Sequence, residues 1–135
     1  MTLHVEVVSP ERILWTGDAQ WVRARTLSGG DIAFLTGHAP FVGALDIGVV
    51  VVHDEDGSEE TIAVHGGFVE VSHDRVTVLS DVAEVASQID VERARAAHER
   101  AEAQLRTEQD AEVEAALRRA RVRIDAATGS LTASH

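Results

Sequence analysis

The chain has 135 residues, of which 44% are hydrophobic, so it is long enough for one domain with a real core, or one domain with a small appendage. It has no cysteine, which excludes disulfides and thiolate metal sites, and its net charge of −11 argues against binding to a nucleic-acid backbone. The N-terminus lacks the pattern of a secretory signal, and the longest apolar run (48–52) is far below the ~20 residues of a membrane helix, so any membrane association has to run through a protein partner.

Residues 1–88 have the pattern of short strands separated by turns. In the first segment, Leu3, Val5 and Val7 alternate with polar residues, which is typical of a half-buried strand. Seven similar segments follow. The turn formers between them are Gly29-Gly30, Asp56-Gly57, Gly66-Gly67 and His73-Asp74. The clearest hairpin is expected at Asp56-Gly57. This pattern predicts an antiparallel β-sandwich of about ten short strands.

The hydrophobic period changes near Asp90. Apolar residues then recur in steps of three and four, with a polar break at 106–112, which predicts an antiparallel hairpin of two helices of roughly four turns each. Ser87 or Asp90 can cap the first helix and Asp110 the second, and Gly129 supplies the C-terminal stop. We therefore expect a sandwich domain at 1–88, a helical hairpin at 89–128 and a flexible tail at 129–135.

Alanine dominates this hairpin. Residues 90–127 contain 11 alanines and no aromatic residue, so the helices form readily but bury little apolar area. One interpretation is a segment that can detach from the sandwich or rearrange at a cost of only a few kcal/mol. The other is a hairpin that stays docked, and composition alone does not separate the two.

The stretch FLTGHAPFVGAL (34–45) raises the question of what His38 does. No nucleophile motif surrounds it, and the seven histidines show neither a metal-binding pair nor a dense cluster, so catalysis and metal binding are both disfavoured. Two interpretations stay open, a turn histidine with a structural hydrogen bond and a residue that contacts a partner.

Three blocks, GDIAFLTGHAPFVGAL, GGFVEVSHDRVTVLSDVAE and IDVERARAAHERAE, occur in this order ahead of an Ala-rich hairpin. The order, spacing and structural context of these blocks resemble those of the epsilon subunit of the bacterial F-type ATP synthase. The resemblance extends from residue 7 through the second helix. The resemblance implies a non-catalytic subunit of the central stalk, whose sandwich contacts the gamma subunit and the c-ring. It also implies that the hairpin can extend toward the alpha and beta subunits and inhibit ATP hydrolysis.

The same resemblance suggests residues for the interface with the c-ring and gamma. They are Asp31, His38, Ala39 and Pro40, with Asp31 and His38 expected on loops at one end of the sandwich. Ala33 and Thr36 depart from the family pattern, which commonly has Gly and Pro at these positions. We expect both departures to be tolerated variation that slightly loosens the placement of His38.

ATP-binding relatives carry an Ile/Leu-Asp-x-x-Arg-Ala motif, which IDVERA matches. The nucleotide-binding residues that this resemblance suggests are Glu84, Asp90, Arg93, Ala94, Arg100, Arg119 and Arg123. The arginines could converge on phosphates if the hairpin folds back. The alternative is that Asp90 is only a helix cap and that the arginines form surface ion pairs, each worth ~0–1 kcal/mol.

The second helix also carries four arginines within six residues: Arg118, Arg119, Arg121 and Arg123. They form either a solvated helix face or, with the hairpin extended, an inhibitory contact with acidic loops of the catalytic subunits. Together these features predict a subunit that couples gamma to the c-ring and needs no cofactor, with ATP as a candidate regulatory ligand. It would lie at the cytoplasmic face of the bacterial membrane through the complex. The alternative function is a nucleotide sensor whose hairpin closes on ATP.

Overall fold

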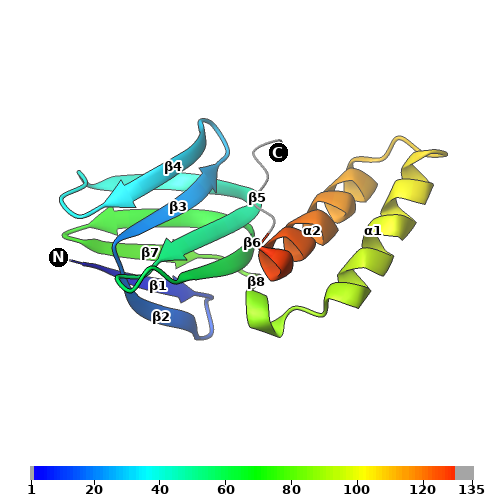
Figure 1. The fold of residues 1–135 in the computed structure, drawn as a ribbon. Helices are drawn as coiled ribbons and strands as arrows, with labels where there is room; N and C mark the ends of the chain where they lie inside the picture. Colours follow the sequence, from blue (N-terminus) through cyan, green and yellow to red (C-terminus); the bar gives the residue numbers. More distant parts are fainter. Residues whose placement is uncertain (1, 130–135) are drawn as a thin grey trace.

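The alternation at the start of the chain produces a strand, as predicted. In β1 (Leu3–Val8), Leu3, Val5 and Val7 are fully buried and the residues between them are half-buried. The computed structural model describes residues 2–129, which form a β-sandwich with a helical hairpin at its side (Figure 1). The other strands are β2 (Ile13–Ala19), β3 (Trp21–Thr26), β4 (Gly30–Leu35), β5 (Phe41–His53), β6 (Glu59–Ser72), β7 (Arg75–Leu79) and β8 (Ala83–Val85). The predicted fold class is confirmed.

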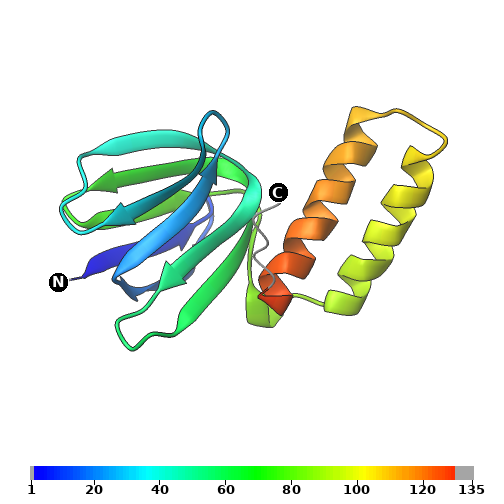
Figure 2. The same ribbon diagram turned by 45° about the horizontal axis from the view of Figure 1, so that its top comes forward.

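The strands form one eight-stranded sheet in the order β2-β1-β7-β6-β5-β3-β4, with β8 paired to β6. The β1–β7 pair is parallel, and the other pairs are antiparallel. β5 and β6 pair from end to end and curve, so that together they contribute to both layers of the sandwich (Figure 2). The space between the layers holds a core of mostly valine side chains around Phe34.

The sheet differs from the sequence prediction at two points. The expected turn at Gly66-Gly67 is wrong, because both residues lie inside β6, with φ of 86° and 124°. The expected count of about ten strands was too high, because residues 2–129 contain eight. Glycine tolerates positive φ, so it lets a strand bend where the sheet passes between layers without ending the pairing.

The tight turns follow local sequence more closely. Asp56-Gly57 connects β5 to β6, which confirms the clearest hairpin prediction. His73 and Asp74, with φ of 52° and 58°, form the two-residue turn between β6 and β7. Asn, Asp and His tolerate the left-handed region better than other non-glycine residues, which explains why this turn was readable from the sequence.

The hairpin consists of α1 (Val91–Leu105) and α2 (Ala111–Thr128), preceded by the 3-10 turn η1 (Ala86–Gln88). The capping predictions are confirmed: the Asp90 carboxylate accepts from the Arg93 N–H, and the Asp110 carboxylate accepts from the Glu112 N–H. Gly129 ends α2 in the left-handed conformation, with φ of 70°. Residues 130–135 of the predicted tail lie outside the described residues.

Candidate functional site

The hairpin is docked on the sandwich through α2, and α1 lies on the far side of α2 (Figures 1 and 2). Four buried apolar residues form the centre of the contact: Ala63, Ile89, Val122 and Ala126. Two of the four are alanines, so this contact buries far less apolar surface than the sandwich core and stabilises docking correspondingly less. The structure therefore has the hairpin folded back, and its hold on the sandwich depends heavily on polar contacts.

Polar contacts between the described residues also join α2 to the sandwich. The Thr61 hydroxyl donates to the carbonyl oxygen of Ala126 at 2.7 Å. The Arg123 Nε donates to Glu84 Oε1 at 2.6 Å, and an Arg118 guanidinium nitrogen lies 3.3 Å from Asp46 Oδ1. The Glu84 and Arg123 side chains are each 31% exposed, so their ion pair is better shielded from water than a typical surface pair.

A second residue of the sheet shares the Glu84 carboxylate. His65 Nε2 lies 3.1 Å from the same Oε1 atom, and the His65 side chain is 4% exposed. We call Glu84, His65 and Arg123 the latch. His65 Nδ1 is buried and has no hydrogen-bond partner within residues 2–129. The latch is thus a dense polar cluster at the seam between β6, β8 and α2.

The pKa values of His65 and Glu84 in the latch both depart from their usual values. Burial lowers the pKa of His65, and the positive charges of Arg123 and Arg119 add to this effect, against the opposing hydrogen bond with Glu84. For Glu84, burial by itself would raise the pKa, but the hydrogen bonds from Arg123 and His65 outweigh it and the pKa is lowered. The docked hairpin therefore favours neutral His65 beside an ionised Glu84.

The predicted nucleotide-binding residues divide into two groups. Glu84 and Arg123 are bonded to each other in the latch, and Arg119 lies close enough to influence His65 while its guanidinium binds Glu112 at 2.8 Å. The others are on α1: Asp90 is the helix cap, Ala94 is buried, and Arg93 and Arg100 are exposed. The structure brings the first group together at the seam and leaves the two α1 arginines in solvent.

All four arginines of the predicted inhibitory contact form ion pairs inside the docked chain. Their partners are Asp46 for Arg118, Glu112 for Arg119, Asp125 for Arg121 and Glu84 for Arg123. Two of these partners, Asp46 and Glu84, belong to the sandwich. Docking therefore neutralises part of the positive charge of α2 with carboxylates that undocking would remove.

Asp31 and His38 were predicted to lie at the same end of the sandwich, but the structure places them apart. Asp31 is in β4, where it pairs across the strands with Arg25, and it lines a cavity beside the hairpin. His38 follows the opposite end of β4, in the loop that continues through Ala39 and Pro40. The placement of Asp31 and His38 on loops at one end of the sandwich is wrong, because β4 runs its full length between them.

The His38 ring is half-buried. It packs edge-on against Phe34, with ring centroids 5.0 Å apart, and its Nδ1 lies 2.7 Å from the carbonyl oxygen of Ala39. A hydrogen bond from the Gly37 N–H to Asp74 Oδ1 at 2.7 Å joins this loop to the turn between β6 and β7. These contacts give His38 a structural role in its loop, which leaves the exposed Ala39 and Pro40 as the accessible part of the block.

A surface that the sequence did not predict crosses the outer face of five strands. Cross-strand neighbours in register carry apolar side chains from β5 to β2: Ala44, Phe68, Leu79, Val8 and Ile13. Phe68 is 56%, Leu79 43% and Ile13 57% exposed, and Val42, two residues before Ala44 in β5, is 68% exposed. We call these six residues the apolar band. Contiguous exposed apolar surface of this kind marks a protein-interaction site.

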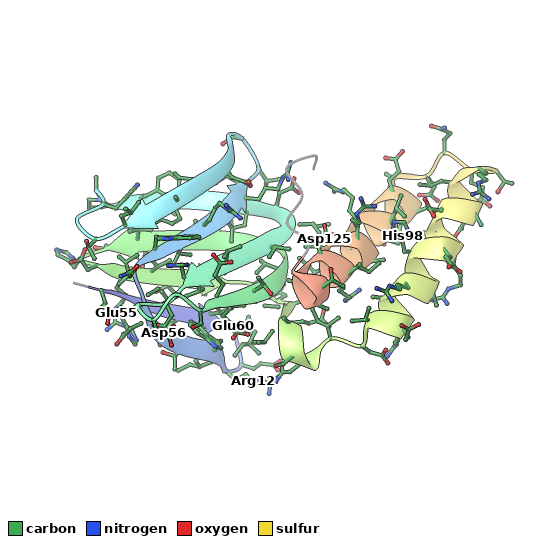
Figure 3. All side chains as sticks on the ribbon, in the orientation of Figure 1. Arg12, Glu55, Asp56, Glu60, His98 and Asp125 are labelled. Carbon is green, nitrogen blue, oxygen red and sulfur yellow. The ribbon has the colours of Figure 1, made fainter. Side chains whose placement is uncertain are left out.

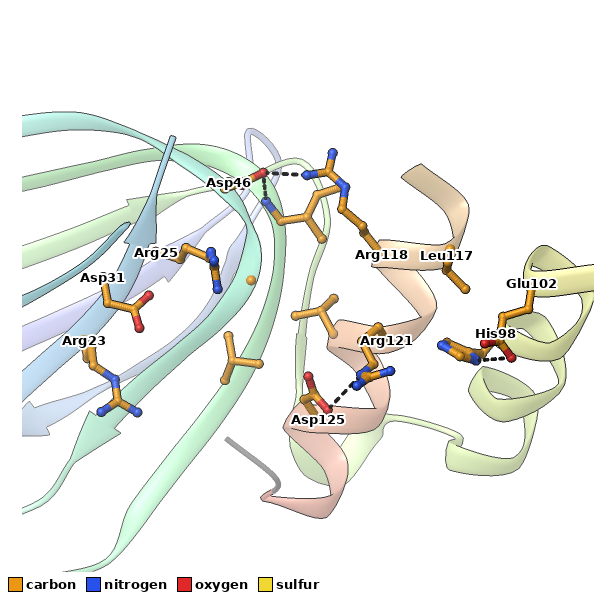
Figure 4. Close-up of a pocket in the computed structure, with 14 residues that line it drawn as sticks. Arg23, Arg25, Asp31, Asp46, His98, Glu102, Leu117, Arg118, Arg121 and Asp125 are labelled. Atoms are coloured by element: carbon orange, nitrogen blue, oxygen red, sulfur yellow. Dashed lines mark hydrogen bonds and ion pairs between the residues drawn. The ribbon is translucent and has the colours of Figure 1, made fainter. Parts of the chain in front are cut away.

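A cavity of about 530 Å³ lies between the sandwich and the hairpin, beside a face of α2 that does not carry the latch residue Arg123 (Figure 4). Its sandwich wall includes Arg23 and Arg25 of β3, and its helix wall includes Arg118 and Arg121 of α2. None of the seven predicted nucleotide-binding residues lines it. The cavity is therefore separate from the latch.

Residues 2–129 lack the features of two other classes of site. No helix in this part of the chain is both long enough and apolar enough to cross a membrane. Nor do three or more His, Asp or Glu side chains within it gather in a way that could hold a metal ion.

Comparison with known proteins agrees with this architecture. The family description "ATP synthase, Delta/Epsilon chain, beta-sandwich domain" matches residues 2–86, and "ATP synthase, Delta/Epsilon chain, long alpha-helix domain" matches residues 87–128. The ATP synthase epsilon chain of Streptomyces coelicolor is 44% identical over 127 residues, covering 94% of this chain and 96% of the relative. That of Alkalihalophilus pseudofirmus is 48% identical over 111 residues, covering 82% of each.

Solved structures share the fold. A chain in the mitochondrial ATP synthase of Euglena gracilis, solved as the OSCP/F1/c-ring in one rotational state, superposes with a TM-score of 0.78 at 22% identity. The match covers 97% of this chain and 82% of that one. At this identity the likeness concerns the fold alone, whereas the family matches span both parts of the chain. The chain belongs to the ATP synthase delta/epsilon chain family.

Proposed function

We propose that this chain is a non-catalytic subunit of the central stalk of an F-type ATP synthase. It couples the gamma subunit to the c-ring and regulates ATP hydrolysis through its hairpin. The family matches across residues 2–128 carry the proposal, because they include the hairpin as well as the sandwich. The chain would then reach the cytoplasmic face of a bacterial membrane through the complex, without inserting into the bilayer itself.

We assign the gamma subunit to the apolar band. The band joins apolar side chains from five strands of one sheet, and four of these strands contribute an exposed one, which suits a permanent contact between subunits. The loop that carries Ala39 and Pro40 is a separate surface, and we assign it to the c-ring. A rotor subunit needs two such contacts, since torque is carried only if both partners are held.

Replacing Phe68 by arginine is expected to weaken binding to gamma by about tenfold or more, because it places a charge in the centre of an apolar contact. The measurement is binding of the full chain to purified gamma subunit. Leu35→Arg is the matched control, since Leu35 is 55% exposed but lies on β4, outside the band. Equal losses in the two variants, or no loss in Phe68→Arg, would contradict the assignment.

The docked hairpin is the non-inhibitory state in this proposal, and the extended hairpin is the brake. Release frees Arg118 from Asp46 and Arg123 from Glu84, so that both arginines can meet acidic loops of the alpha and beta subunits. Two sets of variants then have opposite effects in the assembled enzyme. Asp46→Asn with Glu84→Gln loosens docking but keeps the brake, so ATP hydrolysis is expected to fall. Charge reversal of all four arginines of α2 also loosens docking but removes the brake, so hydrolysis is expected to rise.

Hydrolysis that changes in the same direction in both sets would contradict this mechanism, because loosened docking is common to them and only the arginine charge differs. Hydrolysis that is unchanged in both would show that the hairpin does not regulate the enzyme. A paired change Glu6→Gln with Arg75→Gln serves as the control. It removes a surface ion pair of 2.7 Å between β1 and β7 of the sandwich, and is expected to leave hydrolysis unchanged.

A regulatory ATP molecule is the second candidate. Arg119 and Arg123 lie at the seam, and Arg93 and Arg100 are exposed on α1, so four cations are available near Glu84 and Asp90 if α1 and the seam close on a nucleotide. Binding would require Arg123 to exchange Glu84 for a phosphate. Calorimetric titration with magnesium-ATP tests the idea, and the absence of binding at millimolar ATP would exclude it.

A further inference from the structure

The cavity between the sandwich and α2 contains two arginines that form no ion pair within the described residues. Arg23 and Arg25 lie two residues apart on the outer face of β3, and both are half-buried. Within residues 2–129, neither guanidinium has a carboxylate oxygen at ion-pair distance; Asp31 is the cross-strand neighbour of Arg25 but forms no such pair. A partly desolvated cation without an ion-pair partner costs free energy, which an anion from solution would recover.

The other acids of the cavity are already engaged. Asp46 accepts from Arg118, and Asp125 lies 3.8 Å from Arg121. Glu102 lies 3.4 Å from His98 across one turn of α1. Outside these pairs, the sandwich wall holds two guanidinium groups, those of Arg23 and Arg25, against one carboxylate, that of Asp31. On the opposite wall, Arg121 of α2 forms a long ion pair with Asp125, and a ligand anion that binds Arg121 more strongly could replace that contact.

Packing holds the two sandwich arginines in position. The Arg23 guanidinium lies 6.0 Å from the centre of the Trp21 ring, within the range of a cation–π interaction. The aliphatic part of Arg25 crosses Gly48 of β5, where an added Cβ atom would be only 3.1 Å from the Arg25 Cβ. Both side chains are thus directed along the wall of the cavity (Figure 4), which reduces the entropy that a ligand would have to remove.

We propose that this cavity is a binding site for a small molecule that carries two linked phosphate groups. Arg23 and Arg25 are two strand residues apart, roughly 7 Å between their Cα atoms, so each guanidinium group can bind one phosphate of a linked pair. The cavity volume of about 530 Å³ is within the range of small-molecule sites. A bound diphosphate contacts Arg23 and Arg25 on one side and Arg121 on the other, so it also holds α2 on the sandwich.

Calorimetric titration of the isolated full chain with sodium pyrophosphate, at constant ionic strength, tests this site. We expect one saturable site, weakened about tenfold or more by Arg23→Gln and by Arg25→Gln, since each removes charge-assisted hydrogen bonds. Arg12→Gln is the matched control, because Arg12 is exposed and lies at the edge of the sandwich away from His98 and Asp125 (Figure 3). It should bind as the unmodified chain does. Amide exchange in α2 should slow when pyrophosphate is bound.

Several results would overturn the proposal: no binding at millimolar pyrophosphate, an equal loss in Arg12→Gln, or equal affinity for succinate. A loss of pyrophosphate binding in Arg100→Gln, with none in Arg23→Gln or Arg25→Gln, would assign the anion to α1 and the latch instead. Far-UV circular dichroism establishes that each variant is folded, and retained folding is expected because Gln keeps most of the aliphatic contact. Binding to the isolated chain is independent of assembly into a rotor, so this proposal and the proposed function can fail separately.

Discussion

Replacing Gly67 by alanine is expected to destabilise the isolated chain by about 3 to 5 kcal/mol, through backbone strain added to steric overlap. Gly67 has φ of 124°, a conformation that residues with a side chain rarely adopt. A Cβ atom there would overlap the carbonyl oxygen of Leu79 and lie 3.0 Å from its carbonyl carbon. Backbone atoms of a paired strand cannot move aside without breaking the β6–β7 ladder, so little relief is available.

Urea unfolding of the full chain, followed by circular dichroism, measures this effect. Gly57→Ala is the control, because Gly57 also has positive φ, at 90°, but faces open space. It should cost only about 1 kcal/mol, the ordinary penalty of a left-handed alanine. If Gly67→Ala were no less stable than Gly57→Ala, the close approach of β6 to Leu79 would be wrong.

Lowering the pH from 7.5 to 5.5 is expected to loosen the hairpin. The ratio of docked to undocked chains should fall by up to about tenfold. His65 is buried against α2 with a pKa below its usual 6.5, and undocking exposes it and returns the pKa toward that value. The undocked state therefore takes up a proton first as the pH falls below about 6.5, so docking is weakened from that point downward. The charged groups that face His65 are Glu84, Arg119 and Arg123.

Glu84 acts in the same direction but at lower pH. Its pKa is lowered in the docked state, so the stability that Glu84 adds to docking is fully present above about pH 4.5 and is lost as the pH falls through the docked pKa.

The distance between hairpin and sandwich measures this effect. Because the chain has no cysteine, two cysteines can be introduced and labelled cleanly for the measurement, for example at the exposed Asp54 and Glu108.

His65→Gln should keep the hydrogen bond to Glu84 and abolish the change between pH 7.5 and 5.5. His53→Gln is the control, since His53 pairs with Glu59 and stacks on Trp21, on the sandwich and outside the latch. A distance that does not change with pH, or that changes equally in His65→Gln, would exclude His65 as the titrating group.

Local signals predicted the framework of this protein well. The alternation of Leu3, Val5 and Val7, the Asp56-Gly57 turn, and the caps at Asp90 and Asp110 each depend on residues within a few positions, where side-chain period and backbone preference act directly. The same local logic failed at Gly66-Gly67. A glycine pair is compatible with a turn or with a bend inside a strand, and only the pairing of β6 with β5 and β7 decides between them.

The sequence by itself therefore determined the two-part architecture, the helix boundaries and the low apolar content of the hairpin, and its motifs determined the family. Only the tertiary structure decided how the hairpin is held, because Glu84 and Arg123 are 39 residues apart and Asp46 and Arg118 are 72 residues apart. It also decided that Asp31 and His38 lie at different ends of β4, and that apolar side chains from five strands join into the apolar band. Strand register and helix docking set these contacts, and both result from burying the whole core at once, which no local pattern specifies.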